Sequence, residues 1–506
     1  MNVIIDKKNK FDILLVAEGT YPYVRGGVSG WIHQLINGLK HYRFGIVFIG
    51  SREEDYGEIL YQIPDNLDFL MVAYLFNDSS RPPVMAMEGN KEVIDHVDFI
   101  HDWFRNNEST LPDELQKLSF YNEQVSEKFF LYSHRSWEYI EKKYYEKARE
   151  MPFIDYFWTI RNIHSPIWVV ARIAKALAGR AKVIHSPSTG YAGFLGALLA
   201  FNDNLRYILT EHGIYTKERK IDLLTNDFLS YRKFDIFKEP EEDDVIKQMW
   251  VHFFEGIGRF SYKRADSILS LFIGAQNIQI AYGADAARCR VIPNGVDVER
   301  LGSVIDKRPM IVPKVITLIG RVVSIKDIKT FIRAIRIVQV NIPEVEGWIV
   351  GPMDEEPDYS QECLDMVETF NLQENIKFLG FQNILDILPK SGILTLSSIS
   401  EGMPLVVLEG FAAGVPAVTT DVGSCKELIY GGLHDEDIAI GSAGEVVSIA
   451  NPGALAEGYL KLLEDEVYWH TCQRNALKRV NTYYTQAQFF DAYDSIYEEA
   501  LTPWQE

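Results

Sequence analysis

Two carboxylates, Glu401 and Glu409, lie in one stretch whose residue types could do chemistry together, SSISEGMPLVVLEGFAAGVPAVTTDVGS at 397–424. The pattern predicts a strand end, a loop with Glu401, a helix whose first turn holds Pro404, a stop at Gly414 and a second strand. Helical side chains lean toward the N-terminus, so Glu409 is expected to point back toward Glu401.

The start of this helix would combine free backbone N–H groups with two carboxylates. Free N–H groups at a helix N-terminus bind anions, and carboxylates accept hydrogen bonds from hydroxyl groups. A sugar nucleotide carries both phosphates and hydroxyls, so the combination fits that ligand. The same spacing also occurs in structural ion pairs, and spacing alone leaves the two interpretations equally open.

Two cations, Arg321 and Lys326, lie at a predicted strand–helix junction in VITLIGRVVSIKDIKTFIRAIRIV. Arginine can make two parallel hydrogen bonds to a phosphate, and lysine adds a second positive charge. We expect Lys326 at the start of the helix, where positive charge opposes the helix dipole and a bound anion would remove that conflict. The pair therefore predicts a diphosphate clamp, with a solvated helix start as the structural alternative.

Polar and glycine residues also follow predicted strands in the first half. Gly26 and Gly27 lie in TYPYVRGGVSGW, between the strand FDILLVAEG and a helix whose apolar face includes Trp31. Glycines at such a turn let the backbone approach a phosphate closely. His212 directly follows the strand RYILTEH, at the strand end where parallel sheets bind ligands. Paired glycines are common in structural turns, and a lone histidine is more often structural, so each signal alone is weak.

Four further residues of the first half are weaker candidates for contacts with an acceptor. Lys217 and Arg219 form a basic loop after His212, and His164 precedes a Ser-Pro pair. Tyr23 lies in the glycine-containing turn and completes the set.

Length and composition set the limits of these interpretations. The chain has 506 residues, which predicts two or three domains, and its net charge of −20 argues against bulk binding to nucleic acid or anionic lipid. We find no run of about 20 apolar residues and no signal peptide, so a cytoplasmic protein is expected. The four cysteines are far apart and indicate neither disulfides nor a zinc site.

The alternation of strands and helices predicts an α/β protein with an N-terminal domain at 1–300 and a second domain at 301–485. An aromatic and charged stretch at about 85–160 interrupts the alternation and reads as a helical insertion. The linker 301–314 follows the turn at Asn294. Gly351 and Phe381 fall at ends of predicted strands, where a nucleobase could be received. A final helix at 486–506 completes the chain.

The second-half motifs resemble those of retaining glycosyltransferases of the GT-B fold, family 4 type, over about 290–450. Gly27, Arg321, Lys326, Glu401 and Glu409 follow the order and spacing of that family. The first half, with AEGTYPYVRGGVSGW and TEHGIYTKERKIDLL, is similar to the cytoplasmic glycosyltransferases of Pel exopolysaccharide synthesis.

The resemblance implies two Rossmann-like domains facing a cleft, with the C-terminal helix crossing back to the N-terminal domain. It implies transfer of a sugar from UDP-glucose or a UDP-N-acetylhexosamine to a polysaccharide, with retention of anomeric configuration. Arg321 and Lys326 would bind the donor phosphates, Glu401 the sugar hydroxyls and Glu409 the ribose, with His212 near the transferred sugar. The implied donor site comprises Gly26, Gly27, Asn294, Arg321, Lys326, Gly351, Phe381, Glu401, Gly402, Met403, Pro404, Leu405 and Glu409; His212, Arg321, Lys326 and Glu401 would be catalytic.

No cofactor or metal is expected, because these cations would carry the phosphate charge. The Asp435-Glu436-Asp437 run has the spacing of a metal site but reads as a surface loop. The resemblance implies inner-membrane Pel synthase proteins as partners, and the net charge argues against nucleic acid. Two alternatives remain at this point: a sugar-nucleotide epimerase of the same fold, and a non-catalytic UDP-sugar-binding subunit of a membrane synthase complex.

Overall fold

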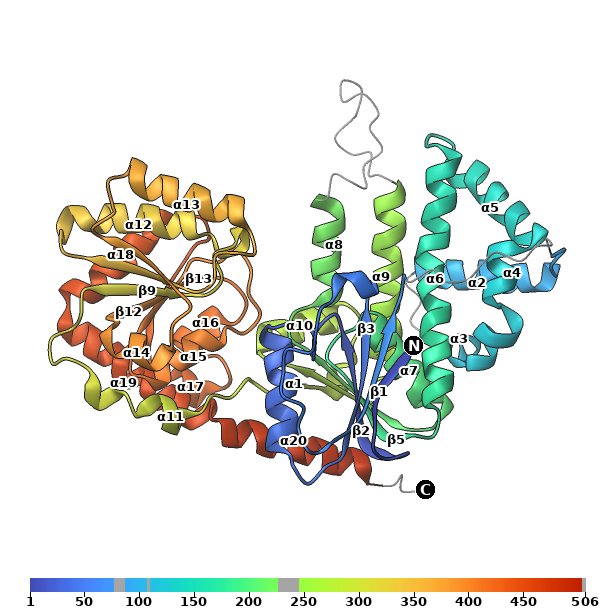
Figure 1. Cartoon of the computed structure of the whole chain (residues 1–506), viewed down its shortest axis with the longest axis horizontal. Coiled ribbons are helices and arrows are strands. Elements are labelled where there is room, and N and C mark those ends of the chain that lie inside the picture. Colours follow the sequence, from blue (N-terminus) through green and yellow to red (C-terminus); the bar gives the residue numbers. More distant parts are fainter. Residues whose placement is uncertain (77–86, 107–109, 226–244, 503–506) are drawn as a thin grey trace. The chain divides into compact units, whose positions relative to one another are not determined.

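The computed structural model describes residues 1–76, 87–106, 110–225 and 245–502 and divides into two compact units (Figure 1). Unit 1 comprises Met1–Ser270, Gln276–Arg290 and Asp494–Glu506; unit 2 comprises Leu271–Ala275 and Val291–Tyr493. Parts of the predicted insertion, 85–86 and 107–109, lie outside the described residues.

Unit 1 is built on an eight-stranded sheet in the order β1-β4-β3-β2-β5-β6-β7-β8. The pairs from β4 through β7 are parallel, and β1 runs antiparallel to β4. Strand β3 is buried at every residue, as expected for a strand covered on both faces. The strands are β1 Asn2–Asp6, β2 Phe11–Glu18, β3 Phe44–Gly50, β4 Leu67–Tyr74, β5 Ala181–Ser186, β6 Arg206–Glu211, β7 Ser267–Ser270 and β8 Cys289–Val291.

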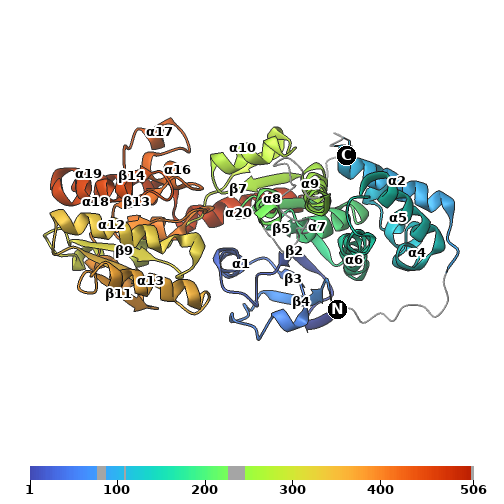
Figure 2. The ribbon, with the colours of Figure 1, turned by 90° about the horizontal axis from the view of Figure 1, so that it is seen from above.

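Helices of unit 1 cover this sheet and form an additional layer beside it (Figure 2). Between β4 and β5 the chain forms α2 Lys91–Asn106, α3 Asp113–Gln116, η2 Phe120–Gln124, α4 Glu127–Tyr132, α5 His134–Lys147 and α6 Phe153–Leu177. These helices share one hydrophobic core with the sheet, through α7 and α9. The remaining helices are α1 Gly27–Gly38, η1 Glu53–Asp55, α7 Tyr191–Asn202, α8 Tyr215–Thr225, α9 Val245–Arg264, α10 Ile273–Ala281 and η5 Ala286–Arg288.

Unit 2 has a six-stranded sheet in the order β11-β10-β9-β12-β13-β14, with all pairs parallel. Helices α12, α13 and α18 cover one face, and α15 and α19 cover the other (Figure 1). The strands are β9 Val315–Ile319, β10 Glu346–Val350, β11 Ile376–Gly380, β12 Ile393–Leu396, β13 Ala417–Thr420 and β14 Gly444–Val447. The helices are α11 Val298–Gly302, η6 Ile305–Lys307, η7 Ser324–Lys326, α12 Ile328–Asn341, α13 Pro357–Thr369, α14 Ile384–Ile387, η8 Leu388–Lys390, α15 Leu405–Ala412, α16 Cys425–Tyr430, α17 Asp435–Ile438, α18 Pro452–Glu464 and α19 Glu466–Tyr483.

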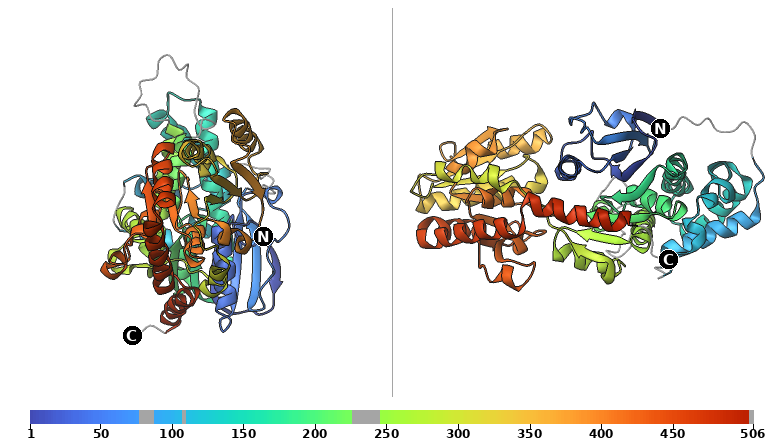
Figure 3. Two further views of the ribbon diagram at one scale, coloured as in Figure 1. Left: turned by 90° about the vertical axis from the view of Figure 1, so that its left-hand side faces the viewer. Right: turned by 90° about the horizontal axis from the view of Figure 1, so that it is seen from below.

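The last helix, α20 Gln486–Leu501, contributes to both units (red in Figure 3). Its residues from Asp494 onward belong to unit 1, where the Tyr497 hydroxyl lies 2.7 Å from Nδ1 of the buried His185. Arg290 pairs with Glu499 at 2.7 Å in the same unit. The two parallel sheets confirm the predicted α/β fold class with two Rossmann-like domains.

Local departures from the sequence prediction have simple causes. Strands β1 and β14 were not predicted, because β1 is mostly exposed and only one residue of β14 is fully buried. In the predicted linker the chain forms the short helical turn η6. None of the described helices combines the length and apolar character needed to cross a membrane.

Candidate functional site

The loop before α15 is held by backbone contacts against the segment that follows β13. Gly402 accepts a hydrogen bond from the N–H of Ser424 at 2.9 Å, and a Cβ on Gly423 would lie 2.0 Å from the Gly402 oxygen. The backbone of Gly423 has φ +52°, so glycine is required there twice over, by conformation and by contact. The loop carrying Glu401 is therefore rigidly placed at the carboxyl edge of the sheet.

Helix α15 begins one residue later than predicted. Pro404 is its N-cap, and its carbonyl accepts from the N–H of Val407 at 3.2 Å. Among the described residues, no hydrogen bond occupies the N–H groups of Leu405 and Val406. The predicted anion-binding N–H groups thus belong to Leu405 and Val406, with proline just outside the helix.

Lys326 and Glu401 form an ion pair at this edge, with Nζ 2.5 Å from Oε1. The same Oε1 accepts from the hydroxyl of Ser398 at 2.6 Å, whereas no partner for Oε2 is recorded among the described residues. Both side chains are mostly enclosed, 22% and 14% exposed. The structure therefore brings together the predicted phosphate-binding lysine and the predicted sugar-binding glutamate, and Oε2 can accept a further hydrogen bond.

Lys326, expected at the start of a helix, lies just before that helix rather than within it. Lys326 ends the short turn η7, and α12 begins at Ile328. The α12 N-terminus is capped by Asp327, which accepts from the N–H of Thr330 at 3.3 Å. The lysine charge is balanced by Glu401 instead, so the dipole argument does not support anion binding, and the ion pair takes its place.

Arg321 lies on the same edge but is half exposed and pairs with Glu355, its Nη1 contacting both carboxylate oxygens. An exposed pair of this kind contributes about 0–1 kcal/mol, so a phosphate can compete with Glu355 for the guanidinium. A clamp of Arg321 and Lys326 would thus require Arg321 to exchange its partner.

Glu409 lies within α15, and burial raises the pKa of its carboxyl, with Arg300 of α11 opposing the shift. No hydrogen bond to its carboxylate is recorded among the described residues. A partly desolvated carboxylate without such a bond is suited to accept from a ligand hydroxyl.

Three other predicted donor residues lie elsewhere in unit 2. Gly351 has φ +154°, and a Cβ there would lie 2.0 Å from the oxygen of Gly320, so it lets the ends of β9 and β10 approach closely. Its N–H donates to Gly380 at 2.9 Å and is not available to a nucleobase. Phe381 is 84% exposed and follows β11. Asn294 is buried and its N–H contacts Sδ of the buried Met403 at 3.3 Å, so this pair supports the loop.

In unit 1, the predicted glycines occupy the start of α1. Gly26 is the N-cap and Gly27 the first residue, and a Cβ on either would have no neighbour within 4 Å. Space is therefore left beside the N–H groups of the first turn, as the sequence predicted for close approach of an anion.

His212 lies at the carboxyl end of β6, against the first turns of α1. Its ring meets Trp31 edge-to-face with centroids 4.6 Å apart. Burial lowers the pKa of His212 to about 3, and its Nε2 is buried with no hydrogen-bond partner among the described residues. The imidazole is therefore neutral at physiological pH and is a weak base.

Sequence reasoning missed a second polar residue at this edge, Glu18. It ends β2, and its carboxylate accepts from the Ala192 N–H at 2.9 Å and the Tyr215 hydroxyl at 3.0 Å. Burial raises the pKa of Glu18, partly offset by these bonds and by Arg219. The sequence did contain a signal for Glu18: it is the acidic residue that ends the first central strand, just before Gly19.

The four acceptor candidates do not form one group. Arg219 stacks over Tyr215 and lies near Glu18, while Lys217 is exposed on α8. Tyr23 packs on Phe48 with ring centroids 4.7 Å apart. His164 is within α6, inside the helical layer between β4 and β5.

The Asp435-Glu436-Asp437 run forms α17, and Asp437 is fully buried against Arg479 at 2.7 Å. Its other oxygen accepts from the N–H of Gly432 at 2.8 Å, so this carboxylate is occupied by protein contacts. Within the described residues, no group of three or more His, Cys, Asp or Glu side chains is placed to hold a metal ion.

Comparison with known families decides the identity of the first half. Residues 11–287, more than half of the chain, match the family model described as a domain of unknown function, DUF3492. The chain belongs to the DUF3492 family. Residues 313–465 match the model described as glycosyl transferases group 1. The DUF3492 region thus holds most of unit 1, and the glycosyltransferase region holds Arg321, Lys326, Glu401 and Glu409.

Solved structures resemble this DUF3492 member over nearly its full length. The match to HepE of Anabaena in complex with UDP covers 96% of this chain and 100% of the HepE chain, with a TM-score of 0.59 and 14% sequence identity. This likeness shows that the fold is GT-B, as predicted.

Curated relatives match shorter segments. An N-acetyl-alpha-D-glucosaminyl L-malate synthase of Bacillus anthracis is 28% identical over 27% of the chain and 34% of its own length. An N-acetylgalactosaminyltransferase of Campylobacter jejuni, acting on N-acetylgalactosamine-N,N'-diacetylbacillosaminyl-diphospho-undecaprenol, is 26% identical over 46% of the chain and 58% of its own length. The chain thus spans less than two thirds of these relatives.

Proposed function

We propose that the protein is a retaining glycosyltransferase that transfers a sugar from UDP-glucose or a UDP-N-acetylhexosamine to a growing exopolysaccharide. One observation carries the proposal: Lys326 and Glu401 meet at 2.5 Å in the segment that leads into α15, whose first N–H groups have no partner among the described residues. This cluster lies in the region similar to glycosyl transferases group 1, and HepE, which has the same fold, has been solved with UDP-glucose.

The charges of the cluster suit a nucleotide diphosphate. Lys326 has three N–H donors, and Glu401 uses one of them, which leaves donors for phosphate oxygens. Leu405 and Val406 add backbone N–H groups at the positive end of a helix dipole. Arg321 adds a guanidinium if it leaves Glu355.

The carboxylates suit the sugars of the donor. Oε2 of Glu401 can accept from a hydroxyl of the transferred sugar, while Lys326 and Ser398 fix Oε1. Glu409 is assigned to the ribose hydroxyls. Two oriented carboxylates discriminate sugar hydroxyls because an unpaired buried acceptor is costly.

The proposed step needs no protein base. The bond between the anomeric carbon and the diphosphate oxygen breaks, and the acceptor hydroxyl forms a bond to that carbon on the same face. The hydroxyl proton passes to the departing phosphate oxygen, so UDP leaves with the electron pair. Negative charge grows on the diphosphate, where Lys326, Arg321 and the α15 N–H groups stabilise it more in the transition state than in the ground state.

Unit 1 residues are assigned to the acceptor side of the reaction. These are the neutral His212 and the carboxyl of Glu18 at the carboxyl edge of the unit 1 sheet, whereas Gly26 and Gly27, which leave open space at the start of α1, stay assigned to the donor. No metal or other cofactor is assigned, because the cations of unit 2 can balance the phosphate charge.

The finer assignment follows the sequence resemblance to PelF. We propose that the product is the Pel exopolysaccharide, that the protein acts in the cytoplasm, and that inner-membrane Pel synthase proteins recruit it. Nucleic acid is not proposed as a partner, because the net charge is −20.

A donor screen tests the function. The purified full-length chain is mixed with UDP-glucose, UDP-N-acetylglucosamine, UDP-galactose or UDP-N-acetylgalactosamine and an oligosaccharide acceptor, and UDP release and products are measured. We expect release from one donor, an acceptor lengthened by one sugar with retained configuration, and a drop of at least tenfold in Arg321→Ala and Glu401→Ala. An epimerised nucleotide sugar, or UDP binding without turnover when the membrane partners are present, would overturn the transferase assignment.

A further inference from the structure

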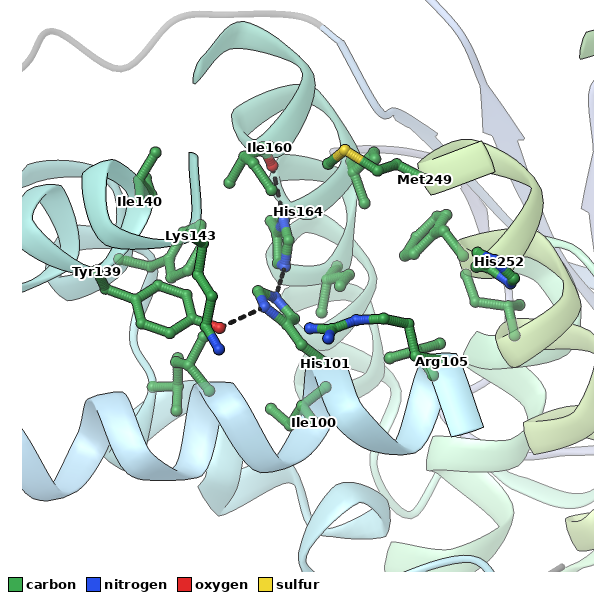
Figure 4. A pocket seen from close by; sticks show the side chains of 18 of the residues that line it. Ile100, His101, Arg105, Tyr139, Ile140, Lys143, Ile160, His164, Met249 and His252 are labelled. Atoms are coloured by element: carbon green, nitrogen blue, oxygen red, sulfur yellow. Dashed lines mark hydrogen bonds between the residues drawn. The ribbon is translucent and has the colours of Figure 1, made fainter. Parts of the chain in front are cut away.

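A cavity of about 400 Å³ lies in unit 1 among α2, α5, α6 and α9, apart from the carboxyl edge of the sheet (Figure 4). Its volume lies within the roughly 300–1,000 Å³ usual for small-molecule sites. Aromatic and aliphatic side chains form most of its wall, including Phe104, Phe120, Phe130, Ile163, Trp168 and Phe253. Such a wall favours a ligand with a substantial apolar body.

The charged groups of the lining have one sign. Arg105, Lys143 and Lys147 line the cavity together with three histidines, and the lining contains no Asp or Glu. The side chain of Lys143 is only 12% exposed. These cations favour an anionic ligand, which would share Lys143 with Asp98, its ion-pair partner at 2.6 Å, and Arg105 with Asp102, its partner at 3.3 Å.

Figure 4 shows a chain of polar contacts across the cavity wall, from the Ile160 carbonyl through His164 and His101 to Tyr139. Nδ1 of His164 lies 2.6 Å from the Ile160 oxygen, so this nitrogen carries a hydrogen. Burial lowers the pKa of His164 to about 4, which leaves a neutral ring whose Nε2 can only accept. Nε2 of His101, 2.7 Å away, is therefore the donor.

This series of polar contacts lacks one hydrogen atom. Burial lowers the pKa of His101 well below its usual value, so His101 is neutral and its Nδ1, 2.8 Å from the Tyr139 hydroxyl, can only accept. The same hydroxyl lies 3.0 Å from the Asp98 carboxylate, a second acceptor. Tyr139 has a single hydrogen for both. A proton on Nδ1 of His101 would satisfy every contact, at the cost of a buried positive charge.

We propose that this cavity binds a lipid anion, a long apolar chain with one acidic head, and that the head lies at His101 and Lys143. The head group offsets the charge of a proton taken up by His101, and the chain fills the apolar part. Groups around His101 are Arg105 on its own helix, Tyr139 and Lys143 on α5, Asp98 through its contacts with both of these, and His164 on α6. This inference does not depend on the glycosyltransferase activity.

Dodecanesulfonate is a suitable probe, because its head remains ionised over the pH range of interest. Isothermal titration calorimetry of the full-length chain, below the micelle concentration, is expected to give one site. Octanesulfonate should bind about 200-fold more weakly, at about fourfold per CH₂ group. Dodecanol should bind at least tenfold more weakly, and dodecyltrimethylammonium should not bind.

Proton uptake is a second measurement of binding. Binding in an unspecific apolar void would not cause proton uptake. At pH 7, titrations in buffers of different ionisation enthalpy should show uptake of close to one proton per dodecanesulfonate. Affinity should rise as the pH falls from 8 to 6, by up to about tenfold per pH unit. His101→Gln should remove both effects.

Matched variants locate the site. Ile163→Trp places a larger side chain in the cavity and should abolish binding, whereas Ile154→Trp, at an exposed position of the same helix, should not change it. Lys143→Met should weaken dodecanesulfonate at least tenfold with no effect on dodecanol, whereas the exposed Lys142→Met should have no effect. Thermal unfolding establishes that each variant is folded.

Equal affinity for the sulfonate, the alcohol and the ammonium compound would overturn the proposal. Several weak sites, no binding, or binding without proton uptake would also overturn it. Displacement of the probe by UDP at matched concentrations would reassign the cavity to a nucleotide.

Discussion

The two sheets place candidate residues at equivalent edges but give them opposite electrostatic states. In unit 2, Lys326 and Glu401 are a charged pair at 2.5 Å, and Arg321 pairs with Glu355 at a half-exposed position. In unit 1, burial shifts His212 and Glu18 toward their neutral forms. The same topology thus presents a charged pair at Lys326 and Glu401 in unit 2, and in unit 1 two buried groups whose pKa values are shifted toward the neutral form.

The difference matches the two partners of a sugar transfer. A diphosphate gains charge as it leaves, and paired cations stabilise it. An acceptor hydroxyl is neutral, and strong charges beside it would favour water over the sugar. The contrast is consistent with the proposal that unit 2 binds the donor and unit 1 the acceptor, and each of the following changes tests one side of it.

The largest effect is expected for Lys326→Met. Losing one charged hydrogen bond to the diphosphate costs about 1.5–3 kcal/mol, and kcat/KM should fall by about tenfold to hundredfold. Arg333→Met, which removes an exposed cation of α12, is the matched control and should retain activity. Initial rates of UDP release measure both; equal losses in the two variants would contradict a specific phosphate contact.

His212→Ala should lower kcat/KM by up to about tenfold, because a neutral hydrogen bond contributes about 0.5–1.5 kcal/mol. Since the pKa of His212 is about 3, the ring does not titrate between pH 6 and 8. The pH–rate profiles of the variant and the unmodified protein should therefore be parallel in this range. A basic limb of the pH–rate profile that is present in the unmodified protein and absent in His212→Ala would show that the histidine titrates. That result would contradict a neutral His212 in unit 1.

Glu355→Gln sharpens the description of unit 2. Removing the carboxylate that holds Arg321 frees the guanidinium, and affinity for UDP should rise by up to about fivefold, the range of an exposed ion pair. Glu362→Gln, which removes a carboxylate from the Lys329 pair on the neighbouring helices, is the control. Weaker UDP binding in Glu355→Gln would mean that Glu355 orients Arg321 rather than competing with the ligand.

The smallest effect concerns stability in unit 1. The pKa of Glu18 is raised in the folded protein, so its carboxyl favours folding below the unfolded pKa, and that contribution is lost as pH rises through the folded value. Glu18→Gln removes this titration. Its melting temperature relative to the unmodified protein should therefore increase from pH 5 to pH 8, as measured by calorimetry. A difference that is constant with pH would contradict the raised pKa.

The sequence predicted the strands and helices that carry the site because their apolar patterns are strong. The run FDILLVAEG became β2, and the helix after Gly27 buries Trp31 as expected. Motif order placed Lys326 and Glu401 in one site, although they are far apart in the chain. These features depend on local pattern and on the rule that parallel strands share a carboxyl edge.

Partner choice was not predictable, because it depends on side chains from distant segments. Nothing near Arg321 in the sequence indicated that Glu355 would pair with it. The sequence also did not show that Asp327 would cap α12, in place of the anion expected to offset the Lys326 charge there. Glu18 was missed because its hydrogen-bond partners, Ala192 and Tyr215, come from two later helices. The cavity at His101 depends in the same way on four helices.

The affinity of UDP for the full-length chain tests the central claim most directly. Isothermal titration calorimetry should show one UDP site, at least tenfold weaker in Lys326→Met and unchanged in Arg333→Met. Equal affinity in all three proteins, or no UDP binding by the unmodified chain, would contradict a donor site at Lys326 and Glu401.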